Sequence, residues 1–262
     1  MIAEGDARSA DGDGDGGDVT IDTLLRGRVT LVQPARGFRS SLDPLLLAAF
    51  VRPPFGRFVD IGCGTGALAF ALAALDPEAT GVAVEIQPRL ASLAARGLAH
   101  NPFAERLAIV EADVRRATGG ASLPAATFDL VATNPPFRAV GGGFVSPNSE
   151  RARANHEVTL KLGEWLDAAA RLVRPGGRVA AVFVAARHDE LLREMRARAL
   201  APRRLRFVHA HLDEPPSRIL VEAIRGEPGE PRSNDRLIVE PPLPLRGPDG
   251  HSAEVRRMLE ES

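Results

Sequence analysis

The stretch RFVDIGCGTG, residues 57–66, decides the fold of this chain. An apolar run ends at Asp60 and passes directly into a loop with glycines at positions 62, 64 and 66, before an alanine-rich segment. Glycines let a backbone turn tightly and approach a ligand closely, and the segment that follows predicts a helix whose first N–H groups are free. Such a strand, glycine loop and helix are typical of a nucleotide-binding α/β fold.

Beyond the loop, strand-like runs alternate with helix-like segments, which predicts a parallel sheet with crossover helices. Two last strands have a connection too short for a helix and are expected to form an antiparallel hairpin. The predicted fold class is α/β, a Rossmann-like doubly wound sheet of seven strands with an antiparallel last strand. The expected strands lie near residues 57–61, 80–85, 106–111, 128–133, 178–184, 204–208 and 218–224, and the expected helices near 66–75, 88–99 and 159–173.

Composition divides the chain into four parts. The acidic first residues, rich in Asp and Gly, have no apolar surface to bury and predict a disordered tail. A short strand and helix extension follows, with a strand-like run from Val29 and a helix start at Asp43 and Pro44, where Asp43 is a candidate N-cap. After the sheet domain, a segment rich in Pro, Gly and charge predicts an irregular tail with a short helix near Ser252–Leu259. The four parts are residues 1–18, 19–55, 56–226 and 227–262.

The overall composition narrows the class of protein. The 262 residues are 44% hydrophobic, enough to bury a core, and no apolar run is long enough for a membrane span. The start of the chain does not resemble a signal peptide, so a cytoplasmic enzyme without membrane contact is expected. The single cysteine, Cys63, excludes a disulfide framework and a cysteine-based zinc site, and no metal is expected. The net charge of −1 argues against a basic nucleic-acid binder but leaves a local basic surface open.

Three acids follow the first three strands of the predicted sheet. Asp60 ends the first strand, Glu85 ends the second, and Asp113 lies just past the third. Glu85 is placed to accept hydrogen bonds from two ribose hydroxyls, whether the ligand is a dinucleotide or S-adenosylmethionine. Asp60 favours S-adenosylmethionine, because a carboxylate would repel a pyrophosphate but attract a cationic methionine group. Asp113 is expected to accept the adenine amino group or to cap a helix, and the two roles are compatible.

The fourth strand ends directly in Asn134-Pro135-Pro136-Phe137. The prolines remove backbone donors and restrict the loop, so the Asn134 amide oxygen and the Pro135 carbonyl can both accept hydrogen bonds from one –NH2 group. An amine conjugated with a ring or a carbonyl is a poor nucleophile, and two acceptors pull it toward tetrahedral geometry. Phe137 offers a flat face on which the acceptor can stack. The motif therefore predicts methyl transfer to a conjugated nitrogen, achieved mostly by positioning.

The motifs D-I-G-C-G-T-G and N-P-P-F, separated by three strands, resemble those of the amino-methylating class I methyltransferases. The flanking segments Gln33–Ala48, Ser146–Glu157 and Pro216–Ala223 resemble the tRNA1(Val) (adenine-37-N6)-methyltransferase family. The resemblance covers roughly residues 20–226. Two features depart from the pattern: Phe137 stands where many amino-methylating enzymes have tyrosine, and a lysine-rich surface is absent, since Lys161 is the only lysine.

The resemblance implies an S-adenosylmethionine-dependent N-methyltransferase that acts on adenine N6 in tRNA. It implies that residues 19–55 cap the cofactor site and that Asp43 closes this site from above, as an alternative to its role as N-cap. The implied cofactor-binding residues are Asp60, Gly62, Gly64, Gly66, Glu85, Asp113 and Asp43, and the implied acceptor-site residues are Asn134, Pro135 and Phe137. Arginines near the predicted mouth of the site either contact phosphate or face solvent. They are Arg36, Arg39, Arg138, Arg151 and Arg153.

Other functions stay open from the sequence. Glutamine N5-methylation of a protein and guanine N2-methylation of rRNA both present a conjugated amine to the same motif. A nicotinamide-dependent oxidoreductase would explain the glycine loop but would leave residues 134–137 without a role. A non-catalytic nucleotide-binding module would tolerate replacement of Asn134.

Overall fold

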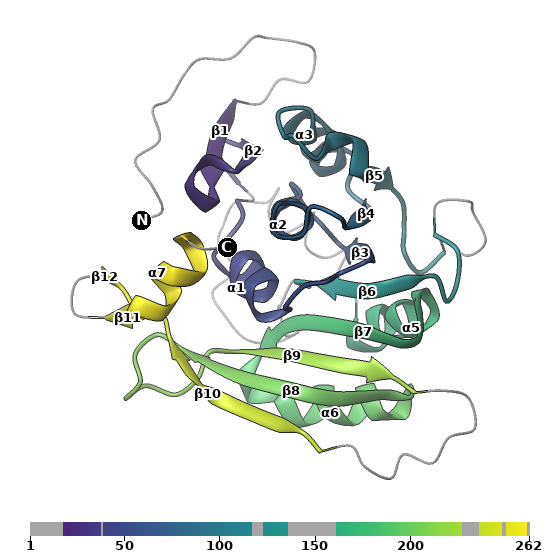
Figure 1. The fold of residues 1–262 in the computed structure, drawn as a ribbon, viewed down its shortest axis with the longest axis vertical. Coiled ribbons are helices and arrows are strands. Elements are labelled where there is room, and N and C mark those ends of the chain that lie inside the picture. The colour runs from purple at the N-terminus through teal and green to yellow at the C-terminus, as the bar shows by residue number, and fades with distance from the viewer. Residues whose placement is uncertain are drawn as a thin grey trace, which may run out of the picture.

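The computed structural model describes residues 18–37, 39–116, 123–135, 161–226, 236–247 and 250–260. Its centre is an eight-stranded sheet in the order β10-β8-β9-β7-β6-β3-β4-β5 (Figure 1). All neighbouring strands are parallel except that β9 runs antiparallel to β7 and β8. The strands are β3 (Arg57–Ile61), β4 (Thr80–Glu85), β5 (Leu107–Glu111), β6 (Phe128–Thr133), β7 (Val173–Val184), β8 (Leu200–His209), β9 (Arg218–Arg225) and β10 (Ile238–Pro244).

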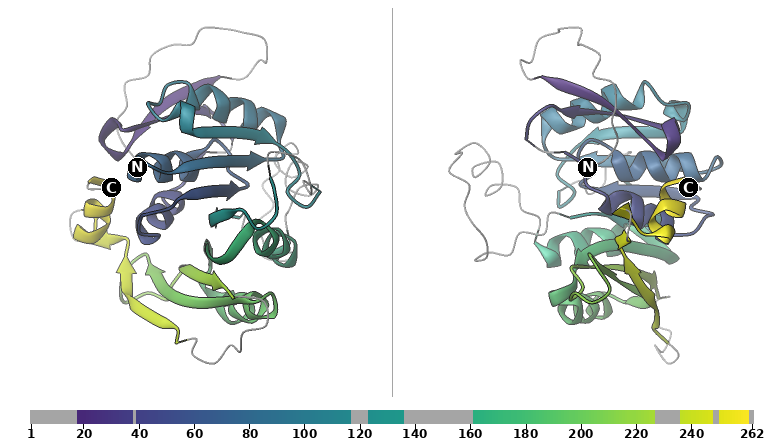
Figure 2. Two further views of the ribbon diagram at one scale, coloured as in Figure 1. Left: turned by 45° about the vertical axis from the view of Figure 1, so that its right-hand side comes forward. Right: turned by 90° about the vertical axis from the view of Figure 1, so that its left-hand side faces the viewer.

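Helices cover both faces of this sheet (Figure 2). One face carries α1 (Asp43–Phe50), α2 (Ala67–Leu75) and α3 (Pro88–Leu98), and the other carries α5 (Leu162–Leu172) and α6 (His188–Ala197). Side chains alternate between the two faces along each strand. Phe58 therefore packs in the core beside α1 and α2, whereas Val59 packs in the core beside α5. This arrangement confirms the predicted doubly wound α/β fold and the antiparallel strand, which is β9. The sheet has eight strands where seven were predicted, and its last strand, β10, runs parallel to β8.

A two-stranded hairpin precedes the sheet domain, formed by β1 (Val19–Leu24) and β2 (Val29–Pro34). The sequence predicts β2 but not β1. The hairpin is tied to the end of α3 by Asn101, whose amide group accepts a hydrogen bond from the Thr30 N–H at 2.8 Å and donates one to the Thr30 carbonyl at 2.9 Å. Val32 packs between Leu90 and Leu93 of α3, so the hairpin lies beside the helix that follows Glu85.

The segment predicted as an irregular C-terminal tail is largely ordered, so this prediction is wrong for residues 236–247 and 250–260. It forms the eighth strand β10, a small β11 (Arg246–Gly247) and β12 (Gly250–His251) hairpin, and α7 (Ala253–Glu260). The proline content suggested no strand, but β10 lies at the sheet edge, where proline's missing N–H is tolerated. The short helix expected near Ser252–Leu259 is confirmed as α7, which packs against α1 (Figure 1).

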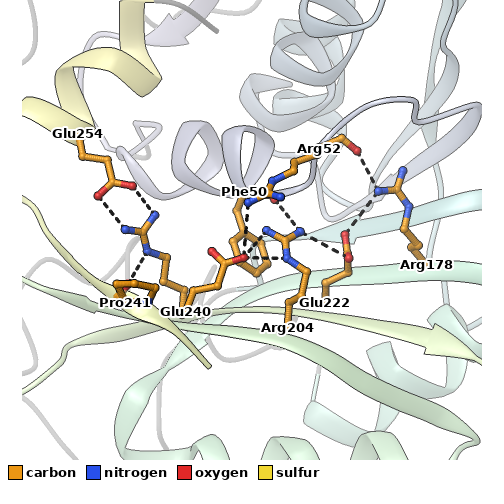
Figure 3. Close-up of polar contacts among 9 residues, drawn as sticks. Phe50, Arg52, Arg178, Arg204, Glu222, Glu240, Pro241 and Glu254 are labelled. Carbon is orange, nitrogen blue, oxygen red and sulfur yellow. Dashed lines mark hydrogen bonds and ion pairs between the residues drawn. The ribbon is translucent and has the colours of Figure 1, made fainter. Parts of the chain in front are cut away.

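Buried arginines attach this C-terminal segment to the sheet (Figure 3). The Arg204 guanidinium stacks on the Phe50 ring at 4.3 Å and makes ion pairs with Glu240 at 2.7 Å and with Glu222 at 3.5 Å. Arg206 donates to the Pro241 carbonyl at 2.8 Å and pairs with Glu254 of α7 at 2.7 Å. Arginine suits these contacts because its planar fork can stack and bind two acceptors at once.

The structure differs from the sequence expectations at two further helices. The charged segment His188–Ala197 forms α6, which the expected helices do not include; it buries Leu191, Leu192 and Met195. Asp43 is the first residue of α1 and makes no side-chain capping bond, so the N-cap prediction is wrong. No helix within the described ranges is both long and apolar enough to cross a membrane.

Candidate active site

The carboxyl ends of β3, β4 and β6 meet at one edge of the sheet. Ile61, the last residue of β3, pairs with Val84 of β4 on one side and with Thr133 of β6 on the other. The residues that follow these three partners are Gly62, Glu85 and Asn134, and they therefore lie at the same level, which brings the glycine loop beside Asn134 and Glu85. In doubly wound folds this edge is where ligands bind.

The glycine loop has a backbone that only glycine adopts easily. Gly62, Gly64 and Gly66 have φ angles of 72°, 57° and 93°, in the left-handed region. The N–H groups of Gly62 and Cys63 both donate to the Val84 carbonyl, at 2.8 and 3.0 Å, which bends the chain toward β4. A Cβ on Gly62 would meet no described atom within 4 Å, so the loop leaves open space at this position.

Glu85 braces the loop from the end of β4. Its side chain is buried, and its two carboxylate oxygens accept hydrogen bonds from the N–H groups of Gly64 and Gln87, each at 2.9 Å. Each carboxylate oxygen has two lone pairs, so both retain capacity for one further donor. Glu85 can therefore hold the loop and still accept two ligand hydroxyls.

Asp60 lies beneath the loop with only 1% of its surface exposed. Its carboxylate accepts a hydrogen bond at 3.1 Å from the N–H of Ala69, in the first turn of α2, so it satisfies one of the free donors at this helix start. Burial raises the pKa of Asp60 to about 8; the Ala69 N–H opposes this rise, and the nearby Glu85 adds to it. A buried acid of this kind is easily converted to its charged form by a cation.

Asp113 lies after β5 and is held by Arg115. The Arg115 guanidinium donates to both Asp113 oxygens, with the shortest contacts at 2.8 Å, and the Arg115 N–H donates to one of them at 3.0 Å. These contacts, led by the Arg115 side chain, lower the pKa of Asp113 and keep it ionised. Arg115 was missed at the sequence level, although its position two residues after Asp113 is typical of a turn closed by a carboxylate.

Asp43, at the first turn of α1, contacts a residue of β9 that is 175 positions away in the sequence. Its carboxylate lies 3.4 Å from Nε of Arg218 and is 17% exposed. The preceding Ser41 hydroxyl oxygen accepts a hydrogen bond from the Asp43 N–H at 3.3 Å. The contact with Arg218 joins the N-terminal extension to the sheet.

The acceptor motif follows β6 at the same edge. Pro135 is buried, and the Asn134 side-chain oxygen is buried without a hydrogen-bond partner among the described residues. The hydroxyl of Thr65 in the glycine loop is also buried and unpartnered within the described ranges. Because an unmet buried acceptor is costly, such groups point to a ligand that supplies the missing donor. Pro136, Phe137, Arg138, Arg151 and Arg153 lie outside the described residues.

Two arginines predicted at the mouth differ in their contacts. Arg39 is paired with Asp22 at 2.8 Å, so its charge is largely neutralised within the N-terminal hairpin region. Arg36 is exposed. Within the described part of the chain, no cluster of three His, Cys, Asp or Glu side chains could hold a metal ion.

Comparison with known proteins identifies the family. The model of the methyltransferase small domain matches residues 41–197. The chain is 31% identical over 229 residues to the tRNA1(Val) (adenine(37)-N6)-methyltransferase of Porphyromonas gingivalis, covering 85% of this chain and 89% of the relative. It is 30% identical over 217 residues to the protein of the same name from Dickeya chrysanthemi, covering 79% and 80%.

Solved structures share the fold. A predicted O-methyltransferase from Agrobacterium tumefaciens superposes with a TM-score of 0.64 at 23% identity, covering 82% of this chain and 94% of that one. The tRNA m1G37 methyltransferase of M. jannaschii gives a TM-score of 0.57 at 16% identity, covering 82% and 59%. The edge that carries the glycine loop and Asn134, together with the matched family model and relatives, shows that the chain is a methyltransferase and belongs to the methyltransferase small domain family.

Proposed function

We propose that this methyltransferase transfers a methyl group from S-adenosylmethionine to the N6 amine of an adenine in tRNA. The observation that carries the proposal is the buried side-chain oxygen of Asn134, directly beside the glycine loop, which has no hydrogen-bond partner among the described residues. An amine that enters this site meets an acceptor that has no other described partner. The relatives named for adenine-37 methylation of tRNA1(Val) give the substrate class.

The residues at the edge fit S-adenosylmethionine. Glu85 has lone pairs for two ribose hydroxyls while it braces Gly64, and the open space at Gly62 admits a ligand against the backbone. The proposed contacts of Asp60 with the cationic methionine group and of Asp113 with the adenine amino group complete the set. Gly64 and Gly66 shape the loop, and we propose that Asp43 closes the site through its contact with Arg218.

Catalysis in this proposal depends on positioning. When bound, S-adenosylmethionine supplies an electrophilic methyl group. The Asn134 oxygen and the Pro135 carbonyl accept hydrogen bonds from the adenine amine, which turns its lone pair toward that methyl. The proton leaves after the nitrogen has become cationic, so no general base is needed. Correct orientation alone can lower a barrier by roughly 7–11 kcal/mol.

The adenine must leave its stack to reach the Asn134 pocket, as in other enzymes that modify bases. Phe137 is proposed to stack on the flipped base, and exposed Arg36 to meet the RNA backbone near the mouth. A reaction on tRNA would take place in the cytoplasm. The two alternatives, methylation of protein glutamine and methylation of rRNA guanine, are distinguished from this proposal by labelling the substrate.

The substrate class is tested with methyl-labelled S-adenosylmethionine and separate total tRNA, rRNA and protein fractions. We expect label in tRNA, recovered as N6-methyladenosine after nucleoside analysis. Label only in protein, or only as methylguanosine in rRNA, would refute the adenine assignment in favour of the corresponding alternative.

Asn134→Ala tests the acceptor assignment. We expect kcat to fall roughly 100-fold, because the amine loses its acceptor, while the Kd for S-adenosylmethionine stays unchanged. Single-turnover kinetics and calorimetry measure the two quantities. Full activity in the variant would show that Asn134 does not contact the amine.

Glu85→Ala tests the ribose assignment. We expect the Kd for S-adenosylmethionine to rise at least tenfold, because two proposed ligand contacts and the brace on Gly64 are lost together. Glu78→Ala removes an exposed carboxylate after α2 and serves as the control with unchanged Kd. Equal affinities of the Glu85 variant and the wild type would exclude Glu85 from the cofactor site.

A further inference from the structure

One buried hydrogen bond joins the strand that leads to the glycine loop with the strand that leads to the acceptor motif. The Thr133 hydroxyl donates to the Ile61 carbonyl at 2.8 Å, and Thr133 is fully buried. These two residues are register partners at the ends of β6 and β3. Each is followed directly by a residue of the proposed site, Asn134 after Thr133 and Gly62 after Ile61.

Beyond this pair, the segments that follow β3 and β6 separate. The N–H groups of Gly62 and Cys63 donate to the Val84 carbonyl, and that of Gly64 donates to Glu85, so the loop is held to β4. Outside the strand ladder, the hydrogen bonds printed for the described loop residues go to β4, to Phe70 of α2 or stay within the loop. The Thr133 hydroxyl thus adds a side-chain bond to the β3–β6 ladder at the point where both strands end.

Packing alone does not require a hydroxyl at this position. Thr133 has Val131 on the same face of β6, and its register partner on β7 is Ala181; both are buried apolar residues of the core beside α5. Valine has the shape of threonine and would fill the same space. What threonine adds is the directional bond to Ile61, which fixes the end of β6 against the end of β3.

We propose that Thr133 is a positioning residue for methyl transfer, which sets the placement of Asn134 relative to the glycine loop through its bond to Ile61. The inference rests on the proposed function of Asn134 and of the loop. Thr133 touches neither ligand in this scheme. It aligns the site that holds the methyl donor with the site that holds the amine, and displacement by about 1 Å can reduce a rate about 100-fold.

The test compares Thr133→Val, Thr133→Ser and Thr127→Val. Thr133→Val removes the hydroxyl and keeps the shape, Thr133→Ser keeps the hydroxyl, and Thr127→Val removes a hydroxyl that donates to Ala125 at 3.0 Å at the opposite end of β6. We expect kcat to fall at least tenfold in Thr133→Val, with KM for tRNA and Kd for S-adenosylmethionine within twofold of wild type. Thr133→Ser and Thr127→Val should keep kcat within threefold.

Two outcomes overturn the inference alone. If Thr133→Val is less heat-stable but keeps wild-type kcat well below its melting temperature, the bond only stabilises the fold. If its Kd for S-adenosylmethionine rises in parallel with the loss of kcat, Thr133 maintains the cofactor loop instead of aligning two sites. A wild-type protein that binds S-adenosylmethionine but methylates no RNA overturns the proposed function, and the inference with it.

Discussion

The carboxyl group of Asp60 is fully buried and lies near a second acid, Glu85. Burial raises its pKa to about 8, so in the cofactor-free protein it is largely protonated at neutral pH. A bound cationic methionine group would stabilise the charged form and lower that pKa. Binding of S-adenosylmethionine at pH 7 should therefore release protons, which calorimetry in buffers of different ionisation enthalpy detects.

The same residue should shape the pH dependence of stability. The folded pKa of about 8 lies above the ordinary value of 3.8, so the stabilising contribution of Asp60 is fully present below pH 3.8 and is lost progressively as the pH rises from 3.8 to about 8. Asn at this position keeps an acceptor for Ala69 and does not titrate. We expect the melting temperature of Asp60→Asn to exceed that of the wild type by more at pH 9 than at pH 5. This excess should grow by at least about 5 °C between the two pH values. Thermal melts without cofactor measure this, and a constant difference would contradict it.

The sequence predicted which polar residues share an edge, because Asp60, Glu85 and Asn134 lie at the carboxyl ends of parallel strands, which must end together. It could not predict how those side chains are occupied. Arg115 holds Asp113 only because the turn after β5 brings them together, and Arg218 reaches Asp43 from β9, 175 residues away in the chain. The Arg218 contact depends on the folded topology and leaves no local pattern, whereas the Arg115 contact belongs to a local turn.

At the scale of elements, the glycine loop makes two different demands on its glycines. A Cβ on Gly66 would lie 2.7 Å from the Phe70 ring, whereas a Cβ on Gly62 would meet no described atom within 4 Å. Gly66 is therefore required by packing against α2 as well as by its φ angle. Gly62 is required by its φ angle and by the space that we assign to the ligand.

Gly66→Ala and Gly62→Ala should accordingly differ in their effects on stability and on cofactor binding. A left-handed alanine costs about 1–2 kcal/mol, and overpacking against Phe70 adds about 1–3 kcal/mol for Gly66→Ala only. Gly62→Ala should be the more stable variant and should still bind S-adenosylmethionine at least tenfold more weakly than wild type. Urea unfolding and calorimetry measure both quantities. Equal stability of the two variants would contradict the packing argument.

Elements with a strong local pattern were predicted to within a few residues, and β3, β4 and β6 match their expected bounds. The missed elements are those whose pattern is overridden by their place in the fold. In α6, charged residues outnumber the apolar ones that it buries on one side. In β10, Pro241 and Pro242 argue against a strand, and only the edge position makes them acceptable.

For the molecule as a whole, residues 236–247 and 250–260 act as a clamp across β8 and α1. Glu254 binds both terminal nitrogens of Arg206, whose side chain is 7% exposed. Glu254→Gln should cost about 1–3 kcal/mol of unfolding free energy, because a buried guanidinium loses its charged partner. Glu190→Gln breaks an exposed pair with Arg187 and should cost at most about 1 kcal/mol.

The stabilisation that the clamp provides should also depend on pH. The Arg206 side chain lowers the pKa of Glu254 below its ordinary value of 4.5. The stabilisation is therefore present above pH 4.5 and is lost as pH falls through the lowered pKa. Urea unfolding of both variants and the wild type at pH 7 and at low pH checks this. A cost for Glu254→Gln that is no larger than that for Glu190→Gln at pH 7 would show that the clamp does not stabilise the fold.

The pairing of β8 with β10 has a consequence for a chain that is still being synthesised on the ribosome. β8 is synthesised before β10, so for an interval its outer edge exposes unpaired backbone groups, the state in which strands of neighbouring chains can join. During that interval Arg204 and Arg206 have neither Glu240 nor Glu254 to neutralise them. Their positive charges, opposed at that stage only by Glu222 of β9, would repel a second copy of the same edge, so we expect the arginines that later fasten the clamp to disfavour the joining of nascent chains.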